Sequence, residues 1–229
     1  MDRIYIRQVF DQRDLNYFWD RQSSLNWVDG IASVVSPSPD AKDSFGTKVK
    51  KVWEARDDQI CDLIMTRLDQ DNEFHGITAP KSTGRVILSR IDRGGFYKPH
   101  ADCPTTGDFS TTLFLADPDS YEGGELKLLI DNELKTVKLK AGWAVTYPTG
   151  LPHEVTEVTS GSRYAAVFWT KTALKDESLR SIYSQVCRLA DLLDDPNMDR
   201  CYPLEKQNKH PFTLVNNLKD QIIRRYFQY

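Results

Sequence analysis

The stretch LKAGWAVTYPTGLPHEVTEVTSGSRYAAVFW covers residues 139–169 and contains three strand-like runs with turns between them. The runs are rich in β-branched and aromatic residues. They cover Trp143–Tyr147, Glu154–Val158 and Arg163–Thr170, the last of which ends one residue beyond the quoted stretch. Glycine-containing pairs that are typical of turns separate them, at Thr149-Gly150 and Ser160-Gly161. Short strands at this spacing predict a mainly β structure here.

The strand pattern extends in both directions, from Gly84 to Lys171. Further runs of the same character cover Val86–Ile91, Thr111–Leu115, Glu125–Ile130 and Lys135–Leu139. Seven or eight strands at such spacing predict a sandwich or a barrel, for example a jelly roll. Glu122 to Glu125, with its glycine pair, is interpreted as a turn that leads into one of these strands.

Helical periodicity flanks the β region on both sides. Helices are predicted from an Asp11 cap to about Gln22, from Asp57 to Asp69, from Asp176 or Ser178 onward, and over residues 214–229. Residues 35–45, VSPSPDAKDSF, predict a loop. We therefore expect a single α+β domain over 1–229, with an N-terminal support region (1–83), a β core (84–171) and a C-terminal helical extension (172–229).

The composition narrows the class of protein. The 229 residues are 40% hydrophobic and 28% charged, with a net charge of −3, which argues against a broad nucleic-acid-binding surface. The four cysteines show no CxxC spacing, and no segment approaches the ~18 apolar residues of a membrane span. No secretory signal pattern is recognised. We expect a cytoplasmic protein without a membrane partner, either a monomer or a homodimer.

A candidate metal site lies in GGFYKPHADCP, residues 94–104. His100 and Asp102 are two residues apart, so on an extended segment their side chains point to the same side. His153 is the candidate third ligand. Two histidines and one carboxylate form the facial triad of non-heme Fe(II) oxygenases, which leaves coordination positions open. The alternative is a hydrogen-bonded His–Asp pair in a polar loop.

Arg163 follows His153 by ten residues. If residues 159–161 form a three-residue hairpin loop with Gly161 in the left-handed conformation, Arg163 points to the same side as His153. The two residues are then offset by about 13 Å along the sheet. A ligand with two carboxylates could chelate the metal at one end and bind the guanidinium at the other. A two-residue loop would reverse the direction of Arg163, and a surface arginine is the alternative.

Several blocks of the chain resemble the bacterial and phage PKHD-type hydroxylases, in the same order. They are GGFYKPHAD (94–102), STTLFLADPDSYEGGEL (110–126), residues 139–169 as quoted above, and KDESLRSIYSQ (175–185), with weaker likeness at LNWVDG (25–30) and residues 216–228. This family is similar to the prolyl and lysyl hydroxylases among the Fe(II)- and 2-oxoglutarate-dependent dioxygenases. The resemblance implies a double-stranded β-helix (jelly-roll, cupin-like) core.

The resemblance also implies the roles of particular residues. Iron would be held by His100, Asp102 and His153, and 2-oxoglutarate by Arg163, with ascorbate as the reductant used in the wider branch. Where relatives carry tyrosines, this chain has Ile91 and Phe114, so another hydroxyl is expected beside Arg163. The candidates for this hydroxyl are Tyr97, Tyr147 and Thr112. Trp143 and Trp169 are interpreted as packing residues of core strands.

The implied activity is hydroxylation of a peptidyl side chain, with proline favoured over lysine and with release of succinate and CO₂. Alternatives are the same chemistry on a small molecule or on a nucleobase, or a metal-binding β-barrel without catalysis. The net negative charge disfavours nucleic acid. Substrate specificity is expected in loops around the site, at residues 30–50 and 103–110.

Overall fold

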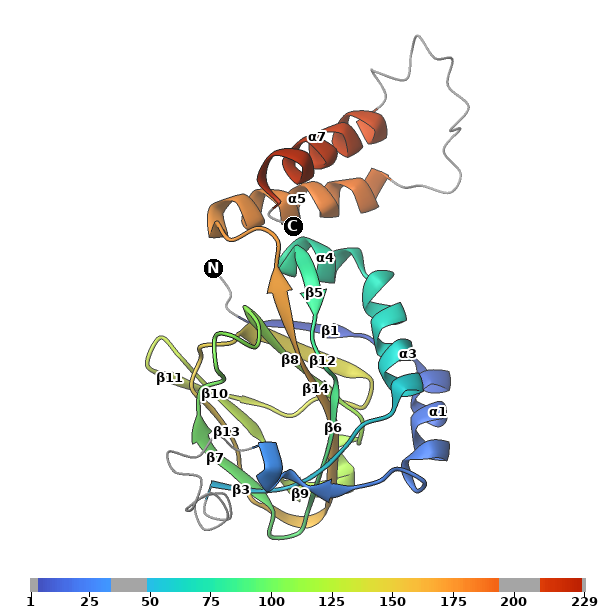
Figure 1. Cartoon of the computed structure of the whole chain (residues 1–229), viewed down its shortest axis with the longest axis vertical. Coiled ribbons are helices and arrows are strands. Elements are labelled where there is room, and N and C mark those ends of the chain that lie inside the picture. Colours follow the sequence, from blue (N-terminus) through green and yellow to red (C-terminus); the bar gives the residue numbers. More distant parts are fainter. Residues whose placement is uncertain (1–3, 34–48, 194–210, 228–229) are drawn as a thin grey trace. The chain divides into compact units, whose positions relative to one another are not determined.

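The computed structural model describes residues 4–33, 49–193 and 211–227 (Figure 1). The chain divides into two compact units. The first comprises Met1–Met65 and Thr83–Thr170, and the second comprises Thr66–Ser82 and Lys171–Tyr229. The expectation of a mainly β protein with flanking helices is confirmed, whereas the single domain stays a prediction. The loop predicted at 35–45 lies outside the described residues.

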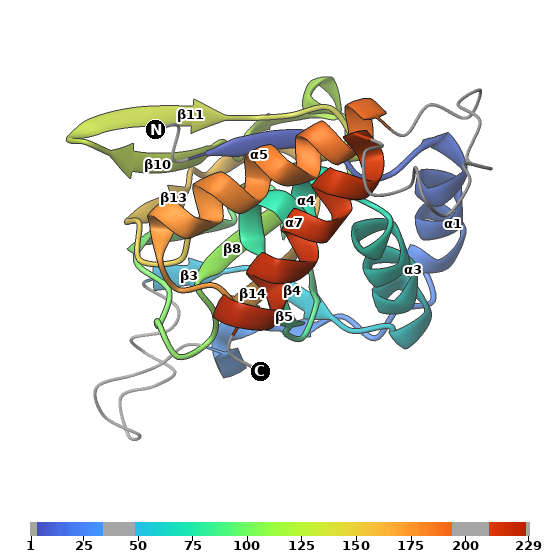
Figure 2. The ribbon, with the colours of Figure 1, turned by 90° about the horizontal axis from the view of Figure 1, so that it is seen from above.

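Two antiparallel sheets form the first unit (Figure 1). The larger sheet has the order β1 (Tyr5–Gln8), β12 (Trp143–Pro148), β8 (Phe109–Phe114), β14 (Val158–Thr172), β6 (Ile87–Asp92), β4 (Trp53–Ala55) and β2 (Val28–Asp29), and β9 (Tyr121–Gly123) also pairs with β14. The smaller sheet has the order β11 (Glu133–Val137), β10 (Leu126–Ile130), β13 (His153–Val155), β7 (Phe96–His100) and β3 (Lys50–Lys51). Figure 2 shows β10 and β11 side by side as a hairpin.

A hydrophobic core fills the space between the two sheets. It combines side chains of β8 and β12 from the larger sheet with side chains of β10 and β11 from the smaller one, namely Phe114, Val145, Tyr147, Leu126, Leu128, Ile130 and Val137. Because alternate residues of a strand point to opposite faces, each strand contributes every second residue to this core. Removing this apolar surface from water stabilises the sandwich.

Helix α1 (Gln12–Gln22) begins where the sequence predicts it. The Asp11 carboxylate accepts hydrogen bonds from the backbone N–H groups of Arg13 and Asp14, at 2.7 and 3.0 Å. The Asp14 side chain in turn accepts from the Asp11 backbone, which completes a capping box. The N-terminal part also contains a short 3₁₀ turn, η1 (Gly30–Ser33), and the helix α3 (Asp58–Asp69). A second 3₁₀ turn, η3 (Pro118–Ser120), lies directly before β9.

The predicted hairpin at residues 159–161 is wrong. Strands β13 and β14 belong to different sheets, and the chain crosses between the sheets at Thr156 and Glu157. Gly161 does have a positive φ of 70°, but it lies within β14, where it pairs with Tyr121 of β9. Arg163 still faces the interior, because the inner faces of both sheets line the same core.

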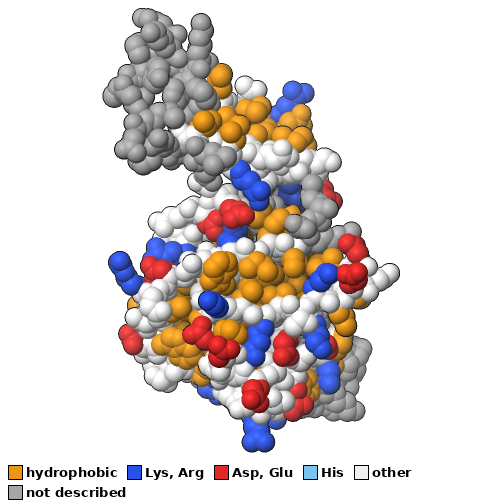
Figure 3. Space-filling view, turned by 180° about the vertical axis from the view of Figure 1, so that it is seen from behind, with side chains coloured by type: hydrophobic (Ala, Val, Ile, Leu, Met, Phe, Trp, Pro, Cys, Tyr) orange, Lys and Arg blue, Asp and Glu red, His pale blue; other side chains and the backbone are white. Residues whose placement is uncertain are grey.

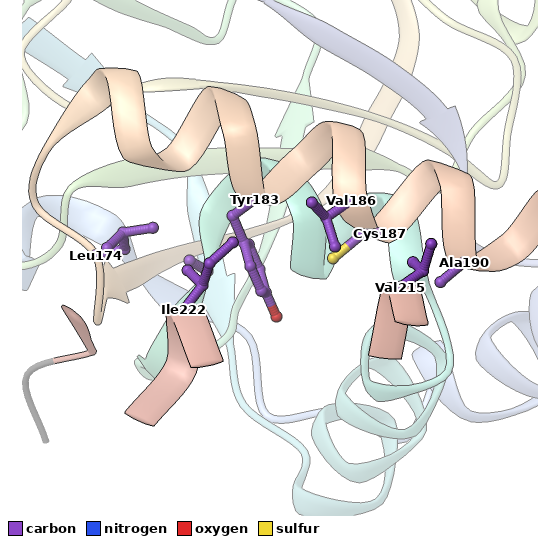
Figure 4. Close-up of a cluster of buried hydrophobic side chains, with 8 residues drawn as sticks. Leu174, Tyr183, Val186, Cys187, Ala190, Val215 and Ile222 are labelled. Carbon is purple, nitrogen blue, oxygen red and sulfur yellow. The ribbon is translucent and has the colours of Figure 1, made fainter. Parts of the chain in front are cut away.

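The second unit is helical and has its own hydrophobic cluster (Figure 4). Its elements are α4 (Asn72–Thr78), the strand β5 (Pro80–Thr83), α5 (Glu177–Leu193) and α7 (Pro211–Tyr226). Asp176 accepts a hydrogen bond from the Leu179 backbone N–H at 2.8 Å, so the predicted start of this helix is confirmed. The cluster comprises Ala79, Leu174, Tyr183, Val186, Cys187, Ala190, Val215 and Ile222.

The strand β7 and the helix α4 were not expected from the sequence. Pro99 lies within β7, and a proline argues against a strand because it has no N–H group to donate. The helix α4 has only seven residues and contains Gly76, and glycine is a poor helix former. Both elements form in spite of these local signals, so contacts with the rest of the fold must outweigh them.

The surface carries charges of both signs. Figure 3 shows Lys and Arg side chains interspersed with Asp and Glu side chains on one face, together with a cluster of hydrophobic side chains. This mixture agrees with the small net charge of −3. Within the described part of the chain, none of the helices combines the length and the apolar character needed to cross a membrane.

Candidate metal centre

The three candidate metal ligands come together at neighbouring strand ends of the smaller sheet. His100 is the last residue of β7 and His153 is the first residue of β13, and the two are direct partners in the antiparallel register. Their side chains therefore leave the same face of the sheet. Asp102 follows β7 by two residues, so the loop after the strand brings its carboxylate to the two imidazole rings.

The distances among these three side chains suit a single metal ion. One ligand atom of each residue lies within 4.8 Å of the others. The Nε2 atoms of His100 and His153 are 3.8 and 3.7 Å from the Asp102 carboxylate oxygens. Two imidazole nitrogens and one carboxylate oxygen are the donor set of the facial triad, which suits Fe(II) and leaves open positions.

Hydrogen bonds orient all three ligands. The Nδ1 atoms of His100 and His153 contact the backbone carbonyls of Lys98 and Leu151 at 2.8 and 2.9 Å. Since a carbonyl only accepts, each Nδ1 carries the proton and each Nε2 is left as the metal-binding atom. Burial, with the neighbouring His153 second, lowers the pKa of His100 to about 4. Its imidazole is therefore neutral at pH 7, which is the form that binds metals.

The Asp102 carboxylate is held by two donors from the larger sheet. Its Oδ2 accepts hydrogen bonds from the Ser110 hydroxyl and from the Trp169 indole N–H, both at 2.9 Å. Ser110 and Trp169 are register partners on β8 and β14. Trp169 thus does more than pack. No sequence signal indicated this role, because the contact joins residues 67 positions apart.

Tyr97 packs against the metal ligand His100. Their rings are stacked, with centroids 3.7 Å apart and an angle of 19° between the planes. The ammonium group of Lys50 lies 4.7 Å from the centroid of the Tyr97 ring and forms an ion pair with Glu54. Burial first, and then the charges of Asp102 and Glu54, raise the pKa of Tyr97 to about 12. The structure thus places Tyr97 at the metal end of the site.

Arg163 is buried, with 2% of its surface exposed. Its guanidinium lies 5.2 Å from the centroid of the Phe114 ring, and its Nε has no hydrogen-bond partner. Burial lowers the pKa of Arg163, and the phenol groups of Tyr121 and Tyr147 oppose this effect. Within residues 4–33, 49–193 and 211–227, no carboxylate forms an ion pair with this guanidinium. A buried cation of this kind is suited to an anionic ligand.

Tyr147 contacts both ends of the site. Its ring meets the His153 ring edge to face, with centroids 5.4 Å apart. Its hydroxyl is hydrogen-bonded to Thr112 and lies in the field of Arg163. Burial raises the pKa of Tyr147, so the phenol is neutral at pH 7. Two of the three hydroxyls suggested by the sequence, those of Tyr147 and Thr112, therefore lie together, and that of Tyr147 interacts with Arg163, whereas Tyr97 lies near the metal ligands.

The sequence of this site matches known enzymes. A family model described as the 2OG-Fe(II) oxygenase superfamily matches residues 86–171. A PKHD-type hydroxylase from Cupriavidus metallidurans is 33% identical over 190 residues, which cover 78% of this chain and 82% of that protein. The chain belongs to the PKHD-type hydroxylases. It is a dioxygenase that depends on Fe(II) and 2-oxoglutarate, as its resemblance to this family implied.

Solved structures show the same fold. An oxidoreductase of the 2OG-Fe(II) oxygenase family from Burkholderia pseudomallei has a TM-score of 0.57 and 15% identity, covering 74% of this chain and 85% of that chain. HygX from Streptomyces hygroscopicus, solved with nickel and 2-oxoglutarate bound, has a TM-score of 0.53 and 12% identity, covering 74% and 83%. The PKHD-type hydroxylase fold is thus the expected double-stranded β-helix.

Proposed function

We propose that this dioxygenase hydroxylates a peptidyl side chain, with proline favoured over lysine. The supporting observation is a gradient of exposure along the site. The Arg163 side chain is buried, whereas the side chain of His100 is 21% exposed, and the residues that follow it, 101–106, are mostly exposed. A buried inner end suits a co-substrate that enters first. An open outer end suits a side chain that remains attached to a polymer.

In this proposal His100, Asp102 and His153 bind Fe(II), and Arg163 binds the remote carboxylate of 2-oxoglutarate. The bound iron, with 2-oxoglutarate and dioxygen, supplies the oxidative chemistry that releases succinate and CO₂ and hydroxylates a C–H bond. Asp102 contributes one negative charge against the metal dication. The hydrogen bonds from Ser110 and Trp169 keep this carboxylate in place and compensate for its burial.

The protein also controls the surroundings of the reaction. Phe114 and Tyr147 contribute apolar ring surface between the two sheets, which keeps water away from the inner end of the site. The neutral Tyr147 phenol adds no charge there. Hydrogen-bond donors that are already ordered, in a site without water, do not have to reorient when charge develops during the reaction, which lowers its barrier.

The substrate proposal is tested by succinate formation. Purified protein with Fe(II), 2-oxoglutarate and ascorbate would be supplied with prolyl peptides, lysyl peptides and the corresponding free amino acids. We expect peptide-dependent succinate release and a peptide mass increased by one oxygen atom, with prolyl peptides the better substrates. Turnover of free amino acids alone would contradict a peptidyl substrate but would leave the dioxygenase assignment intact.

A further inference from the structure

We propose that the Tyr121 hydroxyl is a second protein donor to the remote carboxylate of 2-oxoglutarate. This inference rests on the proposed role of Arg163. Tyr121 is the first residue of β9, which pairs with β14 two residues before Arg163. The Tyr121 side chain is buried, with 3% of the residue exposed. Its hydroxyl is thus brought to the guanidinium from a strand that the sequence did not suggest.

Tyr121 and Arg163 both have unused hydrogen-bonding groups. The Tyr121 hydroxyl and the Arg163 Nε are buried, and neither has a hydrogen-bond partner. The two side chains are close, since a Cβ on Gly124 would contact both Tyr121 Cε2 and Arg163 Cδ. The guanidinium accordingly acts to lower the pKa of the phenol, which burial raises. Buried polar groups without partners are costly and rare in folded proteins, and a ligand that pairs with them removes this cost. A carboxylate has two oxygens and accepts from both donors at once.

The surrounding residues hold Tyr121 in this position. The Lys138 ammonium lies 4.2 Å from the centroid of the Tyr121 ring and donates a hydrogen bond to the Tyr121 carbonyl at 2.8 Å. Gly124 leaves room for the pair, since a Cβ there would lie 3.1 Å from Tyr121 Cε2 and 3.2 Å from Arg163 Cδ. The backbone therefore approaches both side chains too closely for a larger residue.

The other aromatic side chains of the site are less suited to this role. Phe114 presents only a ring face to the guanidinium. The Tyr147 hydroxyl is already hydrogen-bonded to Thr112. Tyr97 is stacked on His100 at the metal end of the site. Among these four aromatic residues, Tyr121 is the one whose buried hydroxyl interacts with the guanidinium and has no other hydrogen-bond partner.

The test is anaerobic titration of Fe(II)-loaded protein with 2-oxoglutarate, followed by the visible metal-to-ligand band. We expect Tyr121→Phe to weaken 2-oxoglutarate binding about tenfold, since hydrogen bonds to charged groups are the stronger ones. Tyr164→Phe is the matched control. Tyr164 neighbours Arg163 in sequence but points to the opposite face of β14. The control is expected to bind 2-oxoglutarate like the unchanged protein.

Pyruvate separates this role from a merely structural one. It keeps the chelating 2-oxo acid group but lacks the remote carboxylate, so Tyr121→Phe is expected to leave pyruvate binding unchanged. Equal weakening for both acids, or no weakening for 2-oxoglutarate, would overturn the inference. Absence of the band in the unchanged protein would instead contradict the proposed co-substrate site, so the two failures are distinguishable.

A second measurement covers the case in which Tyr121→Phe does not fold. The unchanged protein would carry ¹³C-labelled tyrosine and be loaded with Zn(II), which is diamagnetic. Addition of 2-oxoglutarate is expected to shift the Tyr121 ring resonance, and addition of pyruvate is expected to shift it less. An unchanged Tyr121 resonance in saturating 2-oxoglutarate would contradict the contact.

Discussion

At the scale of single residues, the candidate metal centre depends on side chains that do not bind the metal. Asp102 follows a strand and lies in a loop, where a carboxylate would otherwise have several orientations. Ser110 and Trp169 each donate a hydrogen bond to the same oxygen and so restrict it. Such contacts tune metal affinity because they reduce the ordering that metal binding requires.

Trp169→Phe removes one of these hydrogen bonds and keeps most of the packing. We expect it to weaken Fe(II) binding about tenfold. This is the lower end of the loss in metal affinity that follows when a residue hydrogen-bonded to a metal ligand is removed. Anaerobic metal titration of the purified protein measures this change. Trp143→Phe is the control, because Trp143 also lies on a core-sheet strand (β12) but makes no described contact with Asp102. Equal effects of both substitutions would show that packing alone is involved.

Arg163→Met separates ligand binding from stability. The substitution removes a buried charge that no described carboxylate neutralises, so the protein without 2-oxoglutarate should become more stable by about 1–3 kcal/mol. At the same time, 2-oxoglutarate affinity should fall about 100-fold, because charge-assisted bonds are lost. Urea unfolding and co-substrate titration measure the two effects.

Arg90→Met is the matched control for this substitution. The Arg90 guanidinium lies over the Trp27 and Trp53 rings and forms an ion pair with Asp92 at 3.3 Å. Its removal is expected to leave 2-oxoglutarate affinity unchanged and to bring no gain in stability. A destabilised Arg163→Met protein that binds 2-oxoglutarate normally would contradict the assigned role of Arg163.

At the scale of elements, the crossing between the sheets positions the whole site. The chain leaves β13 after Val155 and enters β14 at Val158, so His153 and Arg163 come from different sheets. Strand β9 lies against this crossing. Gly123 has a φ of +68°, and a Cβ at this position would lie only 1.9 Å from the Glu157 carbonyl oxygen. A glycine is therefore required for this close approach.

Gly123→Ala is expected to destabilise the fold by at least about 3 kcal/mol, because backbone strain and a steric clash add together. Gly150→Ala is the control, since a Cβ there meets nothing within 4 Å. Its effect should stay within about 0.5 kcal/mol. Urea unfolding measures the change in the free energy of unfolding for both substitutions. Similar changes for the two would show that β9 can move away from residues 156–157 without loss of stability.

At the scale of the whole molecule, the two compact units raise the question of cooperativity. All five tryptophans, at positions 19, 27, 53, 143 and 169, belong to the first unit. Ile222 belongs to the hydrophobic cluster of the second unit, with 7% of its surface exposed. Tryptophan fluorescence therefore reports unfolding of the first unit alone, even when the second unit is the one that is changed.

Ile222→Ala creates a cavity and should destabilise the second unit by about 2–4 kcal/mol. If the chain is one cooperative domain, as predicted from the sequence, both signals of the Ile222→Ala protein change together. The tryptophan fluorescence transition and the loss of helical circular dichroism then shift to the same lower urea concentration. A fluorescence transition that stays in place while the helical signal is lost earlier would contradict the single domain.

The sequence by itself determined the types of the main elements and the residues of the candidate metal centre. Strand and helix periodicity are local properties, and the capping residues Asp11 and Asp176 act within one helical turn. His100 and Asp102 are close in sequence, so the loop after one strand brings them together. His153 and Arg163 are also candidates from the sequence, but spacing alone left the direction of the Arg163 side chain open, and the family resemblance then implied its role.

Only the tertiary structure decided how these parts meet. The prediction of a hairpin before Arg163 was wrong, because local turn signals do not reveal that the flanking strands join different sheets. Trp169 reaches Asp102, and Tyr121 reaches Arg163, through strand pairings between distant segments. Such pairings depend on the packing of the whole core, which acts over distances in sequence that periodicity does not record.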